Sequence, residues 1–247
     1  MKGIVLAAGY GTRLGALGAR LPKALLPVAG HPVIDSVIEK LAAIGITEVL
    51  VVTNARFFEA FASWRDGGGF PVEVELLNDG STAPENRLGA IRDLWLALER
   101  TDREEDLFVT ASDNLYTGDF RCLVDRFREV RAPIVAMIEE KNPAILRRSG
   151  VAKIGAGGRM ELFVEKPAAP PSSYAAPPLY VYPPDIRVDI AAFLADAAVD
   201  HDAPGHLVAY LLACRPVYGV VMEGKRFDIG SPESYDLAKQ AFERPPE

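Results

Sequence analysis

Leu6-Ala7-Ala8-Gly9-Tyr10-Gly11-Thr12-Arg13-Leu14 is a glycine-rich turn at the end of the apolar run Gly3–Ala8. The run is rich in Ile, Val and Leu, which predicts a fully buried strand. Open α/β sheets bind nucleotides at such a turn, because glycines let backbone N–H groups approach phosphates closely. Leu14 excludes the dinucleotide pattern GxGxxG, and the chain has no P-loop pattern GxxxxGK[ST]. We therefore expect a phosphate-binding loop that belongs to neither class.

Apolar runs alternate with helical patterns on both sides of this turn. Buried strands are predicted at 48–53, 72–77 and 107–111, and helices at 32–44, 55–64, 86–98 and 120–130. This alternation predicts an α/β fold, with a mostly parallel sheet and helices on both faces. After about Pro133 the predicted strands are short, at 134–139, 151–154, 160–164, 217–222 and 226–229, and a last helix is predicted at 232–242. The segment Pro167–Pro184 holds seven prolines and is predicted to be a loop.

Size and composition limit the class of protein. A chain of 247 residues with 49% hydrophobic residues fits one large domain. A formal charge of -7 disfavours duplex DNA and anionic membranes as partners. The two cysteines, Cys122 and Cys214, form neither a CxxC motif nor a Cys/His cluster, so we expect free thiols and no zinc site. Without a secretory or membrane-spanning apolar segment, we expect a cytoplasmic protein with no nucleic-acid or membrane partner. The sequence leaves open whether the chain forms homo-oligomers.

Two cations follow the glycines at short spacing. Arg13 is followed ten positions later by Lys23, within Leu21-Pro22-Lys23-Ala24-Leu25-Leu26-Pro27. A triphosphate carries about four negative charges at neutral pH and needs fixed cations, which a guanidinium and an ammonium supply. Each residue alone would be a solvated loop charge. Together with the glycines, they indicate binding of a nucleoside triphosphate (NTP).

The sequence resembles the sugar-1-phosphate nucleotidyltransferase family at three separated motifs. These are Gly9-x-Gly11-Thr12-Arg13-Leu14, then Pro22-Lys23-x-Leu25-Leu26-Pro27, then Gly30-x-Pro32, and the similarity extends from Lys2 to about Tyr235. The resemblance implies a three-layer α/β/α, Rossmann-like fold in one domain, 1–247. Its nucleotide-binding half would be about 1–132 and its acceptor-binding half about 133–235. It implies catalytic roles for Arg13, Lys23 and Lys166, and nucleotide contacts from Leu6, Ala8, Gly9, Gly11, Thr12 and Asn78.

Two aspartates are candidate ligands for Mg²⁺, which typically binds one or two protein carboxylates and completes its octahedron with phosphates and water. Asp113 follows the predicted strand 107–111, and Asp228 lies in Phe227-Asp228-Ile229-Gly230-Ser231-Pro232-Glu233. In the family that the chain resembles, two such aspartates share the metal, and the second belongs to a DxGTPE-like segment in which Ser231 here replaces Thr. Asp79, Asp93 and Asp119 are expected to be surface groups or helix caps.

The acceptor side is indicated by Phe163-Val164-Glu165-Lys166-Pro167, which resembles the family's EKP segment. The resemblance implies that Lys166 binds the phosphate of the sugar substrate and that Glu165 binds its hydroxyls. Neighbouring side chains on a strand point to opposite faces, so both reach one pocket only if the strand ends there, which Pro167 favours. Gly150 resembles the family's glycine beside the sugar ring, although a turn explains it equally well.

The chain departs from the family in places that leave alternatives open. Arg87 stands roughly where a glycine of the base-binding segment is expected, and Pro178-Leu179-Tyr180 replaces a GxY strand. The loop 78–91 and the segment Ser112–Tyr116 also resemble CTP:phosphocholine cytidylyltransferases. The chain is thus predicted to transfer a nucleoside monophosphate from an NTP to a sugar 1-phosphate. The alternatives are a phosphocholine or other phospho-alcohol acceptor, and a non-catalytic paralogue that senses nucleotide sugars.

Overall fold

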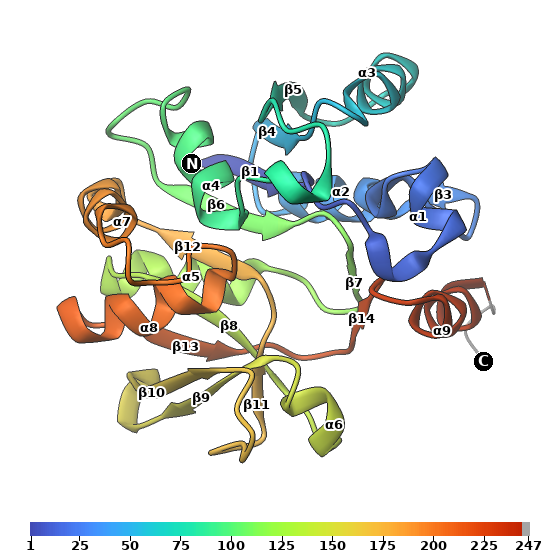
Figure 1. The fold of residues 1–247 in the computed structure, drawn as a ribbon. Helices are drawn as coiled ribbons and strands as arrows, with labels where there is room; N and C mark the ends of the chain where they lie inside the picture. Colours follow the sequence, from blue (N-terminus) through green and yellow to red (C-terminus); the bar gives the residue numbers. More distant parts are fainter. Residues whose placement is uncertain (244–247) are drawn as a thin grey trace.

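A computed structural model describes residues 1–243 of the chain. One mixed sheet runs through the molecule, with helices on both faces (Figure 1). In spatial order its strands are β10 (Met160–Glu165), β9 (Gly150–Ile154), β11 (Tyr174–Ala176), β8 (Ile134–Glu139), β12 (Leu179–Tyr182), β6 (Leu107–Ala111), β1 (Lys2–Leu6), β4 (Glu48–Thr53) and β5 (Glu73–Asn78), and β13 (Tyr218–Val221) pairs with β8. The α/β fold that the sequence predicts is confirmed.

The two ends of the sheet differ in strand direction. β6, β1, β4 and β5 are parallel neighbours. β12 runs antiparallel to β6 and β8, and β11, β9 and β10 continue the sheet in antiparallel pairs. Figure 1 shows β9, β10 and β11 at the end of the molecule opposite β4 and β5. Since ligands of open α/β sheets bind beyond the carboxyl ends of parallel strands, the first half of the chain supplies that edge.

Two apolar cores hold the three layers together. On β1, Ile4 faces one core and Val5 the other, as the two-residue period of a strand requires. The first core packs α2 (Val33–Ala43), α3 (Phe58–Gly67) and α5 (Arg121–Val130) on one face of the sheet. The second packs α4 (Ala90–Leu98), α7 (Ile186–Ala195) and α8 (Pro204–Cys214) on the other face. The predicted helices on both faces are therefore confirmed, although the sequence did not indicate α7 and α8.

Smaller elements lie around these layers. They are α1 (Ala16–Arg20), α6 (Pro143–Leu146), α9 (Pro232–Glu243), the strand pair β2 (Pro27–Val28) and β3 (His31–Pro32), the pair β7 (Asn114–Tyr116) and β14 (Arg226–Asp228), and 3₁₀ turns at Thr12–Leu14, Lys23–Leu25, Pro84–Asn86 and Ala156–Gly158. Within residues 1–243, no helix combines the length and the apolar character that crossing a membrane requires.

The proline-rich segment corrects the prediction of a loop over Pro167–Pro184. It contains β11 and β12, and β12 is fully buried between β6 and β8. All seven prolines lie outside these two strands, so no proline removes a ladder hydrogen bond from them. Prolines 177 and 178 precede the four-residue strand β12, and 183 and 184 follow it. Their number suggested an irregular segment, whereas their spacing leaves room for short strands.

Candidate active site

Two cavities adjoin the carboxyl edge of the parallel strands. The first cavity, of about 540 Å³, is lined by the glycine loop and by residues that follow β6 and begin α4. The second cavity, of about 930 Å³, is lined by β9, by the ends of β8 and β10, and by β14. Six residues line both cavities, namely Arg13, Asp113, Pro178, Tyr180, Asp202 and Pro204. The two cavities are therefore halves of one site that meet at these residues.

The glycine loop after β1 is held by contacts with the segments that follow β4 and β5. The buried amide of Asn54 donates to the Ala8 carbonyl over 2.9 Å, and the Tyr10 hydroxyl lies 2.9 Å from the Ser81 hydroxyl. Gly11 has φ of +61°, which favours glycine, and begins the 3₁₀ turn Thr12–Leu14. This turn leaves Arg13 exposed at the junction of the cavities. The predicted residues Leu6, Ala8, Gly9, Gly11 and Thr12 all line the first cavity.

The two predicted metal ligands are brought together by pairing of distant segments. β14 pairs antiparallel with β7, which places Asp228 opposite Asn114, and the Ile229 N–H donates to the Asp113 carbonyl over 2.9 Å. Burial, and then the neighbouring Asp113 carboxylate, raise the pKa of Asp228, and nearby cations such as Arg226 oppose the shift. Two neighbouring carboxylates repel each other, and a divalent cation bound between them relieves this repulsion.

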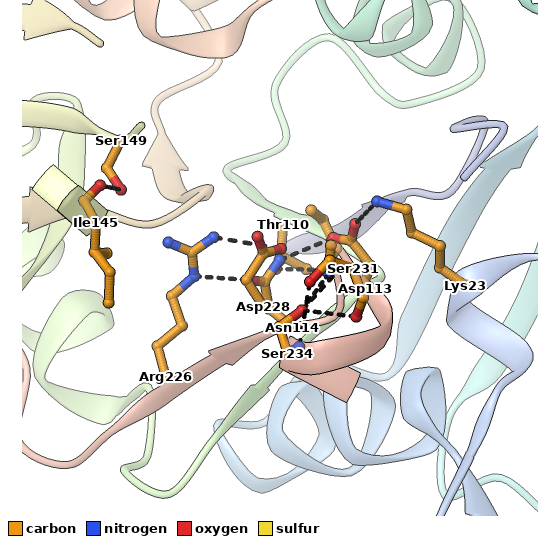
Figure 2. A network of polar contacts seen from close by, with 12 residues as sticks. Lys23, Thr110, Asp113, Asn114, Ile145, Ser149, Arg226, Asp228, Ser231 and Ser234 are labelled. Carbon is orange, nitrogen blue, oxygen red and sulfur yellow. Dashed lines mark hydrogen bonds and ion pairs between the residues drawn. The ribbon is translucent and has the colours of Figure 1, made fainter. Parts of the chain in front are cut away.

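Cations from two sides contact this carboxylate pair. Lys23 Nζ lies 3.2 Å from Asp113 Oδ2. The Asn114 amide donates to Asp113 Oδ1 over 2.9 Å, and Arg226 Nε donates to Asn114 Oδ1 over 2.6 Å. Arg226 also lies 3.7 Å from Asp228. Figure 2 shows this chain of contacts from Lys23 to Arg226.

The residues present fit Mg²⁺ better than a metal held by protein ligands alone. Among the described residues, no cluster of three or more His, Cys, Asp or Glu side chains could hold a metal ion. Two carboxylates, with substrate phosphates and water as further ligands, match the usual coordination of Mg²⁺. Asp113 and Asp228 are thus suited to a cation that arrives with a phosphate ligand.

The acceptor residues converge at the end of β10. The strand ends at Glu165, and Lys166 has a left-handed φ of +47°. This turn lets both side chains line the second cavity, with Lys166 Nζ 3.6 Å from Glu165 Oε1. Gly150 lines it too, and a Cβ at Gly150 would collide with the Phe163 ring. The predicted strand end before Pro167 is confirmed.

Two predictions about the loop after β5 need correction. Asn78 does not line the first cavity, because its amide oxygen accepts the Gly80 N–H over 2.8 Å and stabilises a turn. The next helix was predicted from Asn86 but begins at Ala90, with Gly89 at φ of +89° before it. The small residues Gly89 and Ala90 therefore line the first cavity, and Arg87 also lines it, paired with Asp202 at 3.0 Å.

Asp93 corrects the prediction that it is a surface group or cap. Its side chain is buried on α4 and lines the first cavity. Sequence reasoning also missed Arg226, although it lies two residues before Asp228 on a strand, a spacing that places both side chains on one face. Nothing in the local sequence around Asp93 marks it, since its burial results from the packing of α4 beside the end of β5.

The fold and the paired cavities define an enzyme of the nucleotidyltransferase class. The nucleotidyl transferase family matches residues 2–244, and the chain belongs to this family.

Relatives and solved structures agree with this assignment. The chain is 25% identical to the UTP–glucose-1-phosphate uridylyltransferase AglF of Haloferax volcanii, over 98% of this chain and 97% of that protein. It is 33% identical to a glucose-1-phosphate thymidylyltransferase of an Actinoplanes species, over 75% of this chain and 59% of that protein. The structure of a UDP-glucose pyrophosphorylase from Acinetobacter baumannii shares the fold, with a TM-score of 0.79 and 21% identity, over 98% of this chain and 92% of that chain.

Proposed function

We propose that this protein transfers a nucleoside monophosphate from an NTP to a sugar 1-phosphate, which yields an NDP-sugar and pyrophosphate. The observation that carries the proposal is the junction of the two cavities at Arg13 and Asp113. An NTP in the first cavity would have its α-phosphate at this junction. A sugar 1-phosphate in the second cavity would approach it from the side of Lys166.

The proposed reaction is one displacement at phosphorus. A phosphate oxygen of the sugar 1-phosphate forms a bond to the α-phosphorus, and the bond from that phosphorus to the bridging oxygen of the β-phosphate breaks. Pyrophosphate leaves with the electron pair. A phosphate monoester has a second pKa near 6, so its oxygens are already nucleophilic at pH 7 and no general base is needed. Consistent with this, none of the histidines 31, 201 and 206 is among the described residues that line either cavity.

Each cation has a defined part in this scheme. Lys166 would hold the attacking phosphate, and Arg13 and Lys23 would stabilise the triphosphate and the departing pyrophosphate. Asp113 and Asp228 would hold Mg²⁺, which when bound supplies charge neutralisation at the transferred phosphoryl group. Lys23, now 3.2 Å from Asp113, would then be shared between this carboxylate and the phosphates.

The acceptor is proposed to be a sugar for two reasons. The family's relatives named above act on glucose 1-phosphate. The second cavity also offers Glu139, Glu140 and Glu165 beside its cations, and carboxylates are good acceptors for sugar hydroxyls. A screen of pyrophosphate release tests this by crossing UTP, dTTP, CTP, GTP and ATP with hexose 1-phosphates and phosphocholine. Release with phosphocholine alone would overturn the proposed acceptor, and nucleotide-sugar binding without any release would indicate a non-catalytic protein.

A further inference from the structure

One carboxyl oxygen at the end of the first cavity has no function in the scheme above. Asp93 is the fourth residue of α4 and only 6% exposed, and it lines this cavity together with Gly89 and Ala90. Its Oδ1 atom has no hydrogen-bond partner among the described residues. A buried acceptor without a hydrogen bond is unfavourable, because nothing replaces its lost hydration. An unpaired acceptor on a residue that lines a ligand cavity therefore indicates a ligand group that donates to this residue.

The Asp93 carboxyl group also contacts a second carboxyl group. Asp79, which follows β5, lies within hydrogen-bonding range of the Asp93 carboxyl group. Burial, and then the neighbouring Asp79 carboxylate, raise the pKa of Asp93 to about 8. At neutral pH Asp93 is thus protonated and donates to Asp79, and Ser81 also donates to Asp79 over 2.8 Å. The carboxyl oxygen of Asp93 that does not carry the proton remains, and it can act only as an acceptor.

The position of Asp93 indicates which part of a bound nucleotide it would contact. Asp113 follows β6 and Asp79 follows β5, and β6, β1, β4 and β5 are consecutive neighbours. Three strand spacings amount to about 14 Å. With phosphates between Arg13 and Asp113, the base is the part of the nucleotide that reaches furthest toward α4. Helical side chains lean toward the helix N-terminus, so the Asp93 carboxyl group reaches back toward Gly89 and Ala90.

Charge favours the base over a phosphate at this end. Asp79 and Asp93 together retain one negative charge, and Asp202 lies nearby, where it is paired with Arg87. This environment repels phosphates and accepts neutral groups that carry N–H donors. We propose that Asp93 determines which nucleobase is accepted, with a carboxyl oxygen receiving a hydrogen bond from an N–H of the base. The inference rests on the proposed function, because it places an NTP in the first cavity.

The test compares Asp93→Ala with Asp93→Asn. Asparagine keeps the geometry, because its amide nitrogen can donate to Asp79 while its carbonyl oxygen remains the acceptor. The measurement is kcat/KM for UTP, dTTP, CTP, GTP and ATP with glucose 1-phosphate. Asp93→Ala is expected to reduce the preference for the best NTP over the second best by about 10-fold. Asp93→Asn is expected to keep this preference within about threefold, and the exposed control Asp125→Ala on α5 to leave it unchanged.

Three outcomes would overturn the inference. An equal loss for all five NTPs in Asp93→Ala would assign Asp93 to the scaffold of the loop. A loss in Asp93→Asn as large as in Asp93→Ala would exclude the acceptor oxygen as the cause. If Asp93→Ala lowers kcat/KM for UTP but not for dUTP, which lacks the 2′-hydroxyl, Asp93 contacts the ribose and not the base.

A second measurement uses only the wild-type protein. An analogue of the preferred NTP, with a methyl group in place of the hydrogen on the base N–H, is expected to have a kcat/KM lower by about 10-fold or more. An unchanged value would contradict the inference. If no sugar 1-phosphate is turned over, the proposed function fails, and calorimetry of NTP binding to wild type and Asp93→Ala still tests Asp93. Identical base preferences in that binding experiment would overturn the inference.

Discussion

The two cavities distribute charge in opposite ways. In the first cavity the end with Arg13, Lys23 and Asp113 carries a net positive charge. The other end carries a net negative charge, because Asp93 contacts Asp79 there while Arg87 and Asp202 neutralise each other. In the second cavity cations such as Arg148, Lys166 and Arg226 alternate with Glu139, Glu165 and Asp228. Separated charge fixes the direction of an elongated ligand with one anionic end. Mixed charge suits a compact ligand that carries a phosphate and several hydroxyl groups.

Asp113 lines both cavities and Asp228 lies beside it, so the loss of either carboxylate is expected to have the largest effect. Asp228→Asn and Asp113→Asn should each lower kcat by about 100-fold or more, because transition-state charge loses its stabilisation. EDTA should abolish pyrophosphate release, and added Mg²⁺ should restore it. Steady-state assays of pyrophosphate release measure both effects. Full activity in excess chelator would exclude a metal-dependent junction.

Lys166 tests whether the second cavity handles only the acceptor. Lys166→Ala should raise KM for the sugar 1-phosphate, or lower kcat, by about 10- to 150-fold, which corresponds to one charge-assisted hydrogen bond of roughly 1.5–3 kcal/mol. NTP affinity, measured by calorimetry, should stay within about threefold because Arg13 and Lys23 remain. A variant that loses NTP affinity but keeps acceptor affinity would reverse the assignment of the two cavities.

Gly205 tests the hydroxyl side of the second cavity. A Cβ at Gly205 would collide with Oε2 of Glu165, so alanine there should displace this carboxylate. Gly205→Ala is expected to raise KM for the sugar 1-phosphate by about 10-fold, the lower range for a hydrogen bond to a charged group, because the carboxylate is displaced and not removed. The matched control is Gly67→Ala at the end of α3, where a Cβ has no neighbour within 4 Å. Equal kinetics for the two variants would remove Glu165 from the acceptor site.

Asp93 is expected to make the stability of the protein depend on pH. Its pKa of about 8 means that the folded protein binds this proton more tightly than the unfolded chain does. The contribution of Asp93 to stability therefore falls between about pH 4 and pH 8 and is constant above that range. Asp93→Asn does not titrate, so its Tm relative to wild type should rise with pH across this window, by on the order of 10 °C. Thermal denaturation at several pH values, with Asp125→Asn as control, measures this. A pH-independent difference would show that Asp93 is ionised in the folded protein.

The sequence predicted those parts of the site whose residues are close together in the chain. The glycine loop with Arg13, and the segment with Glu165 and Lys166, each depend on a short motif beside a strand end. Asp113 and Asp228 were predicted singly, because each follows or belongs to a predicted strand.

Residues positioned by long-range packing were not predictable in this way. Helix α4 is amphipathic, so a polar residue on it is expected to face solvent. Only the packing of Asp93 beside Asp79 in the folded protein shows that it is buried. Asn78 was assigned to the nucleotide from the family resemblance alone, and its side-chain oxygen instead accepts a hydrogen bond from the Gly80 N–H in a local turn. The burial of β12 was hidden because the surrounding prolines dominate its local composition.

Because the backbone at Lys166 is left-handed, stability and turnover favour different residues at this position. A residue with a Cβ at φ of +47° is disfavoured by about 1–2 kcal/mol, a penalty that glycine largely avoids. Lys166→Ala keeps this backbone strain, whereas Lys166→Gly relieves it, and both remove the ammonium group. The glycine variant should therefore melt at a higher temperature than the alanine variant, although both are equally impaired with the sugar 1-phosphate. Selection for thermal stability alone would drive this position toward glycine and away from activity.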